Sequence, residues 1–187
     1  MDAPTLKTQR LLLRPFSDGD IEPMVRGIFS NPNVMAMLPH DPQSDDESRV
    51  YAREYTYLYM AQWSDEDFGG WAVCSNSQAI APIGELLGFC GFEPGHIDGY
   101  RLELGYGYKQ ESWGKGVGLE AAIASRDWFL SQERWNRFYA SFVPGNTGSE
   151  RIIQRIAMNY LGERDLWGSV EKGIGLRPVY TFEKPSA

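Results

Sequence analysis

Glycine is unusually dense in residues 105–121, where five of the seventeen residues are glycines and Gly114, Gly116 and Gly118 alternate just before an apolar, helix-like stretch. Backbone N–H groups in the first turn of a helix have no intrahelical partner, and the helix dipole adds partial positive charge there. Alternating glycines let an anion approach these N–H groups closely, and Lys115 adds a cation beside them. The segment therefore predicts a site for an oxygen-rich anionic group such as a pyrophosphate.

Three kinds of glycine-rich loop compete for this pattern. A Walker A loop needs a GK[ST] ending, and no such sequence occurs in the chain. A dinucleotide fingerprint can be forced onto Gly116-x-Gly118-x-x-Ala121, but it should follow the first strand of a parallel βαβ unit, and this segment follows several strand-like segments at mid-chain. The third kind is the Q/R-x-x-G-x-G/A loop that holds the pyrophosphate of acetyl-CoA, with Trp113 here at the Q/R position.

The chain resembles the RimJ/RimL-type branch of the GCN5-related N-acetyltransferase (GNAT) superfamily in three landmark segments, which occur in the right order. These segments are LKTQRLLLRPF, LELGYGYKQESWGKGVGLEA and PGNTGSERIIQRIAMNYLGERD. Tryptophan in place of Q/R, with Glu120-Ala121 following, is typical of the branch, and the resemblance spans residues 6 to about 168. It implies one N-acetyltransferase domain over residues 1–187. The implied class is α+β, with a mixed, mostly antiparallel sheet that is splayed at the cofactor site and has helices on both faces.

The resemblance also implies which residues hold acetyl-CoA, the expected co-substrate. They come from the strand before the loop, the loop itself and the last helix: Tyr106, Tyr108, Trp113, Gly114, Lys115, Gly116, Val117, Gly118, Asn146 and Ser149. Glycines on both sides of Tyr106 indicate a bulge or splay in the strand, which would free backbone amides for the pantetheine arm and the acetyl group. Plain strand irregularity is the alternative explanation.

An acetyl transfer to an amine needs a base, because an alkyl amine is protonated near pH 7. Family members with a base on the strand before the glycine loop place it about where Glu103 stands, so Glu103 is the candidate base, acting directly or through a water. The alternative is a strand glutamate on the open face of the sheet or one paired with an arginine such as Arg101.

The leaving thiolate of CoA benefits from a proton donor, and many relatives use a tyrosine on the last helix. Ile153 takes that position here. What remains is the RimL-type pattern Asn146-x-x-Ser149, in which the asparagine holds the pantetheine arm and the serine hydroxyl reaches the sulfur. Ser149 is therefore the candidate acid; simple helix capping is the alternative role for both residues.

The acceptor site is expected between the first and second strands, where the family varies most. Tyr51, Tyr55 and Tyr59 recur every four residues on one helix face, a spacing that is also typical of core residues. We take Tyr55, Tyr59 and His40 as candidate acceptor-binding residues. A cationic amine would be attracted by nearby acids, which could equally form a solvated face: Asp41, Asp45, Asp46, Glu47, Glu54, Asp65, Glu66 and Asp67. The acceptor is expected to be a small-molecule amine or a peptide N-terminus.

Length and composition exclude several other classes of protein. The 187 residues make one ordinary domain, and a net charge of -7 argues against a nucleic-acid partner. The chain shows neither a secretory signal pattern nor a long apolar run, which predicts a cytoplasmic protein without a membrane partner. Cys74 and Cys90 are expected as buried free thiols, and with only His40 and His96 in the chain no metal site is predicted. The sequence leaves open whether the chain forms a homodimer.

Apolar periodicity predicts the elements that must position these residues. Strands are predicted over residues 11–16, 68–75, 86–93, 100–108 and 137–143, with one or two more in 164–182. Helices are predicted over 21–29, 44–63, 118–130 and 146–160, and residues 31–43 are predicted to form a proline-rich loop. Ser44 and Glu47 form a capping box for the second helix. The family usually closes its last helix with a leucine-glycine pair. Ile156-Ala157 stands there, so the helix is expected to continue to Gly162.

These inferences predict an N-acetyltransferase in which the amine attacks acetyl-CoA directly in a ternary complex. A second class stays open, in which the domain binds acyl-CoA as a regulatory module without turnover.

Overall fold

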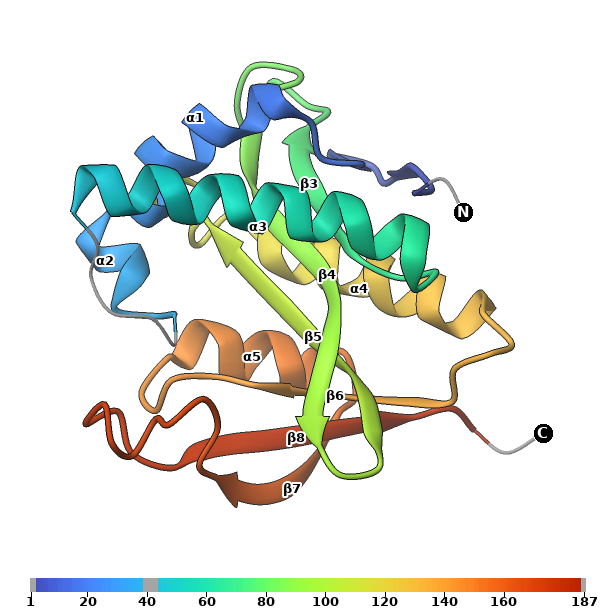
Figure 1. The fold of residues 1–187 in the computed structure, drawn as a ribbon. Helices are drawn as coiled ribbons and strands as arrows, with labels where there is room; N and C mark the ends of the chain where they lie inside the picture. The colour runs from blue at the N-terminus through green and yellow to red at the C-terminus, as the bar shows by residue number, and fades with distance from the viewer. Residues whose placement is uncertain (1–2, 39–43, 186–187) are drawn as a thin grey trace.

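The computed structural model describes residues 3–38 and 44–185, and its centre is an eight-stranded sheet (Figure 1). The strand order is β1-β2-β3-β4-β5-β6-β8-β7. All neighbouring strands are antiparallel except β5 and β6, which are parallel. The strands are β1 (Leu6–Lys7), β2 (Leu11–Arg14), β3 (Gly70–Ser75), β4 (Leu86–Ile97), β5 (Tyr100–Tyr108), β6 (Arg137–Ser141), β7 (Asn159–Arg164) and β8 (Arg177–Glu183).

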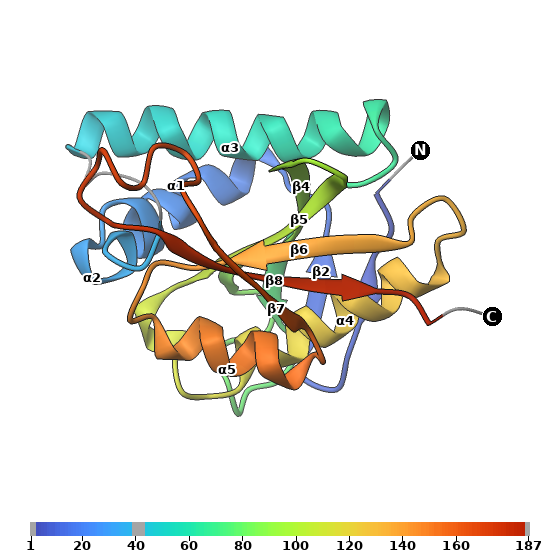
Figure 2. The same cartoon turned by 90° about the horizontal axis from the view of Figure 1, so that it is seen from below.

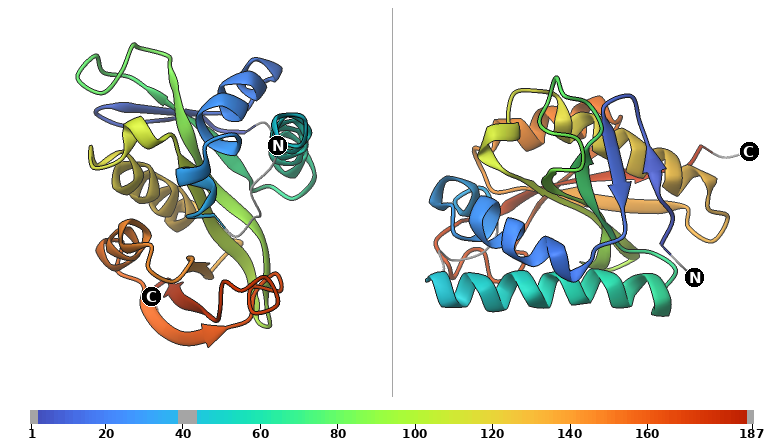
Figure 3. Two further views of the ribbon diagram at one scale, coloured as in Figure 1. Left: turned by 90° about the vertical axis from the view of Figure 1, so that its left-hand side faces the viewer. Right: turned by 90° about the horizontal axis from the view of Figure 1, so that it is seen from above.

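Helices cover both faces of this sheet, as Figures 2 and 3 show. One face carries α1 (Ile21–Met24), which continues as a π-helical turn (Val25–Phe29), together with α2 (Pro32–Met35) and α3 (Asp45–Asp65). The other face carries α4 (Val117–Ser131) and α5 (Thr147–Arg155). The predicted α+β class is therefore confirmed.

Two apolar clusters fill the space between the sheet and its helices. The cluster toward α4 and α5 includes Phe92, Phe129 and Ile153, and the cluster toward α1, α2 and α3 includes Phe29 and Tyr59. Because both faces are covered, every residue of β3 is buried, and its sequence GWAVCS shows no alternation of polar and apolar residues.

The sheet opens between its two parallel strands. β5 and β6 pair only at Glu103↔Tyr139, and in Figure 1 the two strands diverge beyond that point. β5 nevertheless keeps a continuous register with β4 from Leu102 to Tyr108, so the splay is present and no bulge interrupts the glycines. The glycine at 107 has another function: a Cβ there would lie 2.6 Å from the ring of Phe89. The last residues of β5 thus present one backbone edge that no strand covers.

Local capping signals position the helices on the α1–α3 face. Ser44 and Glu47 form the predicted capping box, in which the Ser44 N–H donates to Glu47 Oε2 at 2.9 Å and α3 begins. The predicted loop 31–43 is partly wrong, because Asn31 caps a helical turn, α2, with Pro32 in its first turn. Its Oδ1 accepts the Asn33 N–H at 3.0 Å.

The prediction that the last helix reaches residue 160 or beyond is wrong. α5 ends at Arg155, and Ala157 adopts a left-handed conformation with φ of 64°. The chain then enters β7 at Asn159, so Tyr160 is exposed instead of lying on an apolar helix face. An alanine therefore fills the position that glycine usually fills after a helix, and the pattern of apolar residues gave no sign of the stop.

Several strand boundaries also differ from prediction. The strands predicted over 11–16, 68–75 and 137–143 are shorter and form β2, β3 and β6. β4 continues four residues beyond its predicted end at Glu93 to Ile97, and it pairs with β5 up to Ile97↔Tyr100. β1 was not predicted; it is only two residues long and pairs with Leu12 and Leu13.

Candidate active site

Two cavities adjoin at the point where β5 separates from β6. The large cavity has a volume of about 620 Å³ and lies between the glycine loop, β5 and the first turn of α5. The small cavity has a volume of about 130 Å³ and lies between β4, β5 and the end of β6. Four residues line both of them: Met37, Leu38, Tyr106 and Ser149.

The glycine loop presents a helix N-terminus to the large cavity. Gly116 caps α4 with φ of 78°, and Gly114 has φ of 72°, conformations that glycine adopts without strain. The Glu120 N–H is the first in α4 to find a backbone acceptor, the Gly116 carbonyl at 3.1 Å. The three preceding N–H groups of the helix, those of Val117, Gly118 and Leu119, have no such backbone acceptor, and all three residues line the large cavity.

Gly118 lines the large cavity, and the packing around it also leaves no room for a side chain. A Cβ at this position would lie 2.8 Å from Ile152 Cδ1 and 3.1 Å from the Tyr108 ring, so a side chain would fill the space between α4 and α5. Trp113 is 40% exposed and its indole N–H donates to the Tyr108 carbonyl at 3.0 Å. This bond joins the loop to the end of β5.

The predicted cation of the loop does not line the large cavity. The Lys115 ammonium instead donates to the Ile80 carbonyl at 3.4 Å. Two other cations, Arg151 and Arg155, line the cavity from α5. The sequence analysis missed them, although their spacing of four residues on the helix that Asn146 begins was a readable signal.

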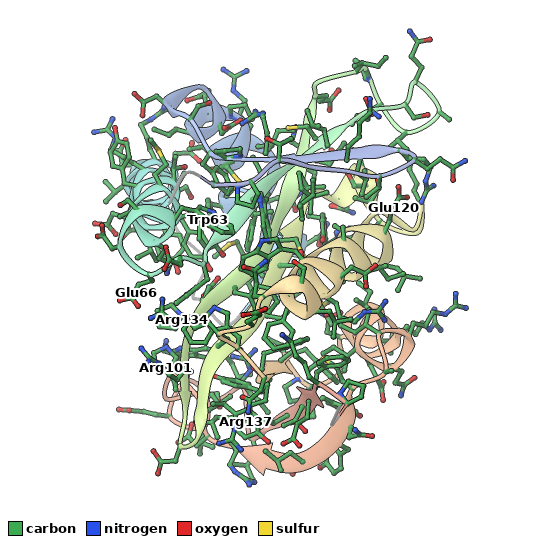
Figure 4. The ribbon with its side chains drawn as sticks, turned by 90° about the vertical axis from the view of Figure 1, so that its right-hand side faces the viewer. Trp63, Glu66, Arg101, Glu120, Arg134 and Arg137 are labelled. Carbon is green, nitrogen blue, oxygen red and sulfur yellow. The ribbon has the colours of Figure 1, made fainter. Side chains whose placement is uncertain are left out.

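The loop is held by the N-terminal strands. Glu120 lies beside the β1–β2 hairpin (Figure 4), where one carboxylate oxygen accepts from the Thr8 hydroxyl and the Arg10 N–H, and the other from Arg10 Nε at 2.7 Å. Arg10 also donates to the Lys115 carbonyl at 2.9 Å. Two of the segments that carried the family resemblance therefore contact each other directly.

The start of α5 lies at the junction of the cavities. Asn146 caps the helix by accepting the Ser149 N–H at 3.0 Å, so the capping role is real. The Tyr106 hydroxyl donates to the Ser149 carbonyl at 3.4 Å. Burial raises the pKa of Tyr106, and a hydrogen bond with the Ser149 side chain opposes this effect. Ile153 is fully buried in the core below this turn.

Glu103 lies in the small cavity and is only 4% exposed. Its carboxylate accepts from the Tyr139 hydroxyl at 2.7 Å and from the Ser141 hydroxyl at 2.9 Å. Burial, together with the charge of Glu93, raises the pKa of Glu103 to about 8, although both hydrogen bonds and the charge of Arg177 oppose the rise. Glu103 is thus neither exposed nor paired with Arg101, which stacks on Trp135.

A second carboxylate, Glu93, lines the small cavity from β4 directly opposite Glu103. It accepts from the Tyr55 hydroxyl at 2.8 Å and from the Tyr59 hydroxyl. Gly105 leaves room for it, because a Cβ there would lie 2.8 Å from Glu93 Oε1. Tyr55 lines the cavity, whereas Tyr59 is fully buried behind Glu93.

The acidic residues around α3 do not supply the carboxylates of the small cavity, which come from β4 and β5 instead. Four residues near Glu103 were not predicted from the sequence, because only the pairing of the strands brings them close to it: Glu93, Tyr139, Ser141 and Arg177. His40 and Asp41 lie outside the described residues.

Metal and membrane features are absent from the described ranges. Residues 3–38 and 44–185 contain no group of three histidine, cysteine, aspartate or glutamate side chains that could hold a metal ion. Within the same ranges, no helix is both long enough and apolar enough to cross a membrane.

Comparison with known proteins identifies relatives along the whole chain. Residues 10–159 match the family described as "Acetyltransferase (GNAT) domain". The chain is 28% identical over 188 residues to the uncharacterized protein YkkB of Bacillus subtilis (strain 168), covering 100% of this chain and 99% of that protein. It is also 28% identical over 179 residues to the uncharacterized N-acetyltransferase p20 of Bacillus licheniformis, covering 95% and 94%.

A solved structure shares the fold at much lower identity. Mycobacterium smegmatis RimJ, in complex with CoA-disulfide, superposes with a TM-score of 0.74 over 96% of this chain and 86% of that chain, at 14% identity.

Proposed function

Because the chain belongs to the GNAT acetyltransferase family, in its RimJ/RimL-type branch, we propose that it transfers the acetyl group of acetyl-CoA directly to a primary amine held in the small cavity. The observation that carries this proposal is the junction of the two cavities at Tyr106 and Ser149, with Glu103 buried in the smaller one. Two substrates could occupy adjoining spaces at the same time, as a ternary complex requires.

The residues of the large cavity fit acetyl-CoA. The α4 N-terminus between Gly116 and Gly118 would hold the pyrophosphate, and Arg151 and Arg155 supply positive charge for the remaining phosphate oxygens. The uncovered edge of β5 beside Tyr106 and Asn146 at the start of α5 would hold the pantetheine arm. Bound acetyl-CoA supplies an acetyl group on a thioester sulfur.

Direct transfer is favoured over an acetylated enzyme because the chain offers no suitable thiol at the site. Cys74 and Cys90 are buried, and neither lines a cavity. Burial raises the pKa of both thiols, to about 11 for Cys90, so neither forms the reactive thiolate readily.

Glu103 is the proposed base. A carboxylate with a pKa of about 8 accepts a proton from an ammonium group far more readily than an ordinary glutamate does, because the two pKa values lie closer together. Tyr139 and Ser141 hold the carboxylate in one orientation from β6. The acceptor is proposed to be a small-molecule amine or a protein N-terminus that reaches this carboxylate directly or through a water.

Ser149 is the proposed acid for the leaving sulfur. Ser149 lines both cavities, so its hydroxyl lies where they adjoin. Tyr106 lies beside it, and burial raises the pKa of the Tyr106 hydroxyl, which keeps it protonated.

The proposal is tested by thiol release from acetyl-CoA with polyamines, amino acids, aminoglycosides and short peptides as acceptors. Glu103→Gln is expected to lower kcat at least 100-fold near pH 8, which is the lower end of the usual range for losing a general base. Ser149→Ala is expected to lower kcat about tenfold or more. Glu163→Gln, an exposed carboxylate of β7 that lines neither cavity, is the matched control and should leave kcat unchanged.

Two outcomes would contradict parts of this proposal. Normal turnover by Glu103→Gln would remove Glu103 as the base. Binding of acetyl-CoA without thiol release for any acceptor would favour the non-catalytic acyl-CoA-binding module instead.

A further inference from the structure

Arg177, the first residue of β8, is an arginine that the proposed mechanism does not use. It is only 2% exposed and lines the small cavity together with Glu103 and Glu93. Its Nε and Nη1 atoms are buried and have no hydrogen-bond partner within residues 3–38 and 44–185. Buried guanidinium donors without partners are rare in native proteins and costly, so the group requires a functional or structural reason.

The sheet directs this side chain toward Glu103. β6 and β8 pair at Tyr139↔Thr181 and Ser141↔Val179, so residues 181, 179 and 177 of β8 share the face of Tyr139. Tyr139 donates to Glu103 from that same face. β6 ends at Ser141, and Arg177 therefore lies beyond its end, where the cavity begins.

One wall of the small cavity holds the guanidinium in place. The Arg177 guanidinium carbon lies 4.4 Å from the centre of the Trp167 ring, and Trp167 itself lines the cavity. This stacking leaves the in-plane N–H donors available. No carboxylate in the described ranges approaches the Arg177 nitrogens within ion-pair distance. Burial lowers the pKa of Arg177 to about 10, and the charge of Glu103 opposes this effect.

The small cavity thus combines two carboxylates with one unpaired guanidinium. A planar guanidinium binds a carboxylate through two parallel N–H donors, and the carboxylates attract an ammonium group. A dianionic phosphate suits the cavity less well, because Glu93 and Glu103 would repel it. The volume of about 130 Å³ suits a compact head group.

Resting on the function proposed above, we infer that Arg177 binds a carboxylate of the acceptor, and that the acceptor is a free α-amino acid or an equally compact amino carboxylate. Its ammonium group faces Glu103 and Glu93, and its carboxylate faces Arg177. The rest of the wall is largely apolar, with Phe29, Phe89 and Phe142, and accepts an apolar side chain.

The test compares matched acceptors that differ only in the carboxylate. Thiol release from acetyl-CoA is measured with leucine, leucinamide and 3-methylbutylamine, and with phenylalanine, phenylalaninamide and 2-phenylethylamine. We expect kcat/KM to be about 100-fold higher for each amino acid than for its amide or amine, the loss that follows when a charge-assisted bidentate pair is removed. This comparison uses the unaltered protein, so it does not depend on a variant that folds.

Substitutions then assign the preference to Arg177. Arg177→Gln is expected to lower kcat/KM for the amino acids about 100-fold and to change the values for the amines less than threefold. Arg177→Lys should give an intermediate value, because it keeps the charge without the planar donor pair. The matched control is Arg134→Gln: Arg134 also stacks on a tryptophan, at 4.6 Å from the Trp135 ring centre, but it is exposed next to Arg101 and outside both cavities (Figure 4).

The outcomes separate this inference from the proposed function. Turnover of amides, amines or amidated peptides as efficiently as the amino acids, unchanged in Arg177→Gln, would overturn the inference and leave the acetyltransferase proposal intact. If the protein acetylated only amidated peptides that begin with aspartate, the acceptor would instead be a protein N-terminus.

If no acceptor is turned over, the CoA-saturated protein is titrated with leucine and phenylalanine in a calorimeter to test whether Arg177 binds a carboxylate. Binding that Arg177→Gln abolishes supports the carboxylate site, and the absence of binding overturns it. The acetyltransferase proposal, by contrast, is contradicted if no acceptor gives thiol release.

Discussion

Glu103, the proposed base, is a carboxyl group that the fold buries at a cost to stability. Its carboxyl group is buried opposite a second carboxylate, and hydrogen bonds from Tyr139 and Ser141 only partly offset the loss of water. An arginine near the cavity, Arg177, moderates the pKa without an ion pair. The surroundings therefore keep a proton on Glu103 near neutral pH. A higher pH removes it, and the positive charge of a bound acceptor would favour the carboxylate and the release of that proton to solvent.

The raised pKa of Glu103 predicts a particular dependence of stability on pH. Between pH 4.5 and about 8, the folded chain keeps the proton that an unfolded glutamate loses, so the free energy of unfolding falls as pH rises. Glu103→Gln removes this dependence. We expect the melting temperature of the variant, relative to the unaltered protein, to rise from pH 5 to pH 8.5 in thermal unfolding.

The same unfolding series includes Glu163→Gln, an exposed glutamate, as its control. A constant difference between Glu103→Gln and the unaltered protein across this pH range would mean that Glu103 has an ordinary pKa.

At the scale of elements, the end of α5 shows how one residue determines where a helix gives way to a strand. Ile156 is fully buried, so the chain must turn sharply at Ala157 for Asn159 to enter β7. At this turn Ala157 adopts a left-handed φ of 64°, which strains an alanine but would not strain a glycine.

Ala157→Gly is expected to stabilise the protein by about 0.5–1 kcal/mol, because relief of the left-handed strain exceeds the added entropy of the unfolded chain. The measurement is urea unfolding at pH 7. Ala124→Gly, the same substitution inside α4, should instead destabilise the protein by about 1 kcal/mol. A destabilised Ala157→Gly variant would show that the methyl group has a packing role at the helix end.

At the scale of the whole molecule, the large cavity joins parts that are distant in the sequence. Its walls come from α2 and the turn after it, β5, the glycine loop and α5, and α4 contacts α5 through Gly118 and Ile152. A ligand in this cavity would bridge the two sides of the splayed sheet. Its binding energy would then add to the stability of the complete domain.

Acetyl-CoA at 100 times its dissociation constant is therefore expected to add about 2.7 kcal/mol to the free energy of unfolding. For a domain of this size that corresponds to a rise of about 5–10 °C in melting temperature. Gly118→Val should abolish most of the rise, because its side chain would meet Ile152 and Tyr108, while Gly19→Val, far from the cavity, should preserve it. No rise for the unaltered protein would contradict the assignment of the large cavity.

Features that depend on neighbours in the sequence could be predicted. The capping box at Ser44, the glycine loop before α4, the strand that carries Glu103 and the cap at Asn146 each consist of residues a few positions apart, whose preferred conformations are largely local. The three landmark segments also identified the family. The sequence by itself therefore determined the class of fold, the position of the glycine loop and the position of the candidate base.

The surroundings of Glu103 were decided only by the tertiary structure. Tyr139 and Ser141 reach it from β6, and Arg177 comes from β8, a strand that the sequence analysis placed only within a broad range. Strand order and register arise from packing of the whole chain, and no local pattern encodes which distant side chains share a face. The charge balance of the small cavity, on which the proposed class of acceptor rests, therefore becomes visible only once the sheet is assembled.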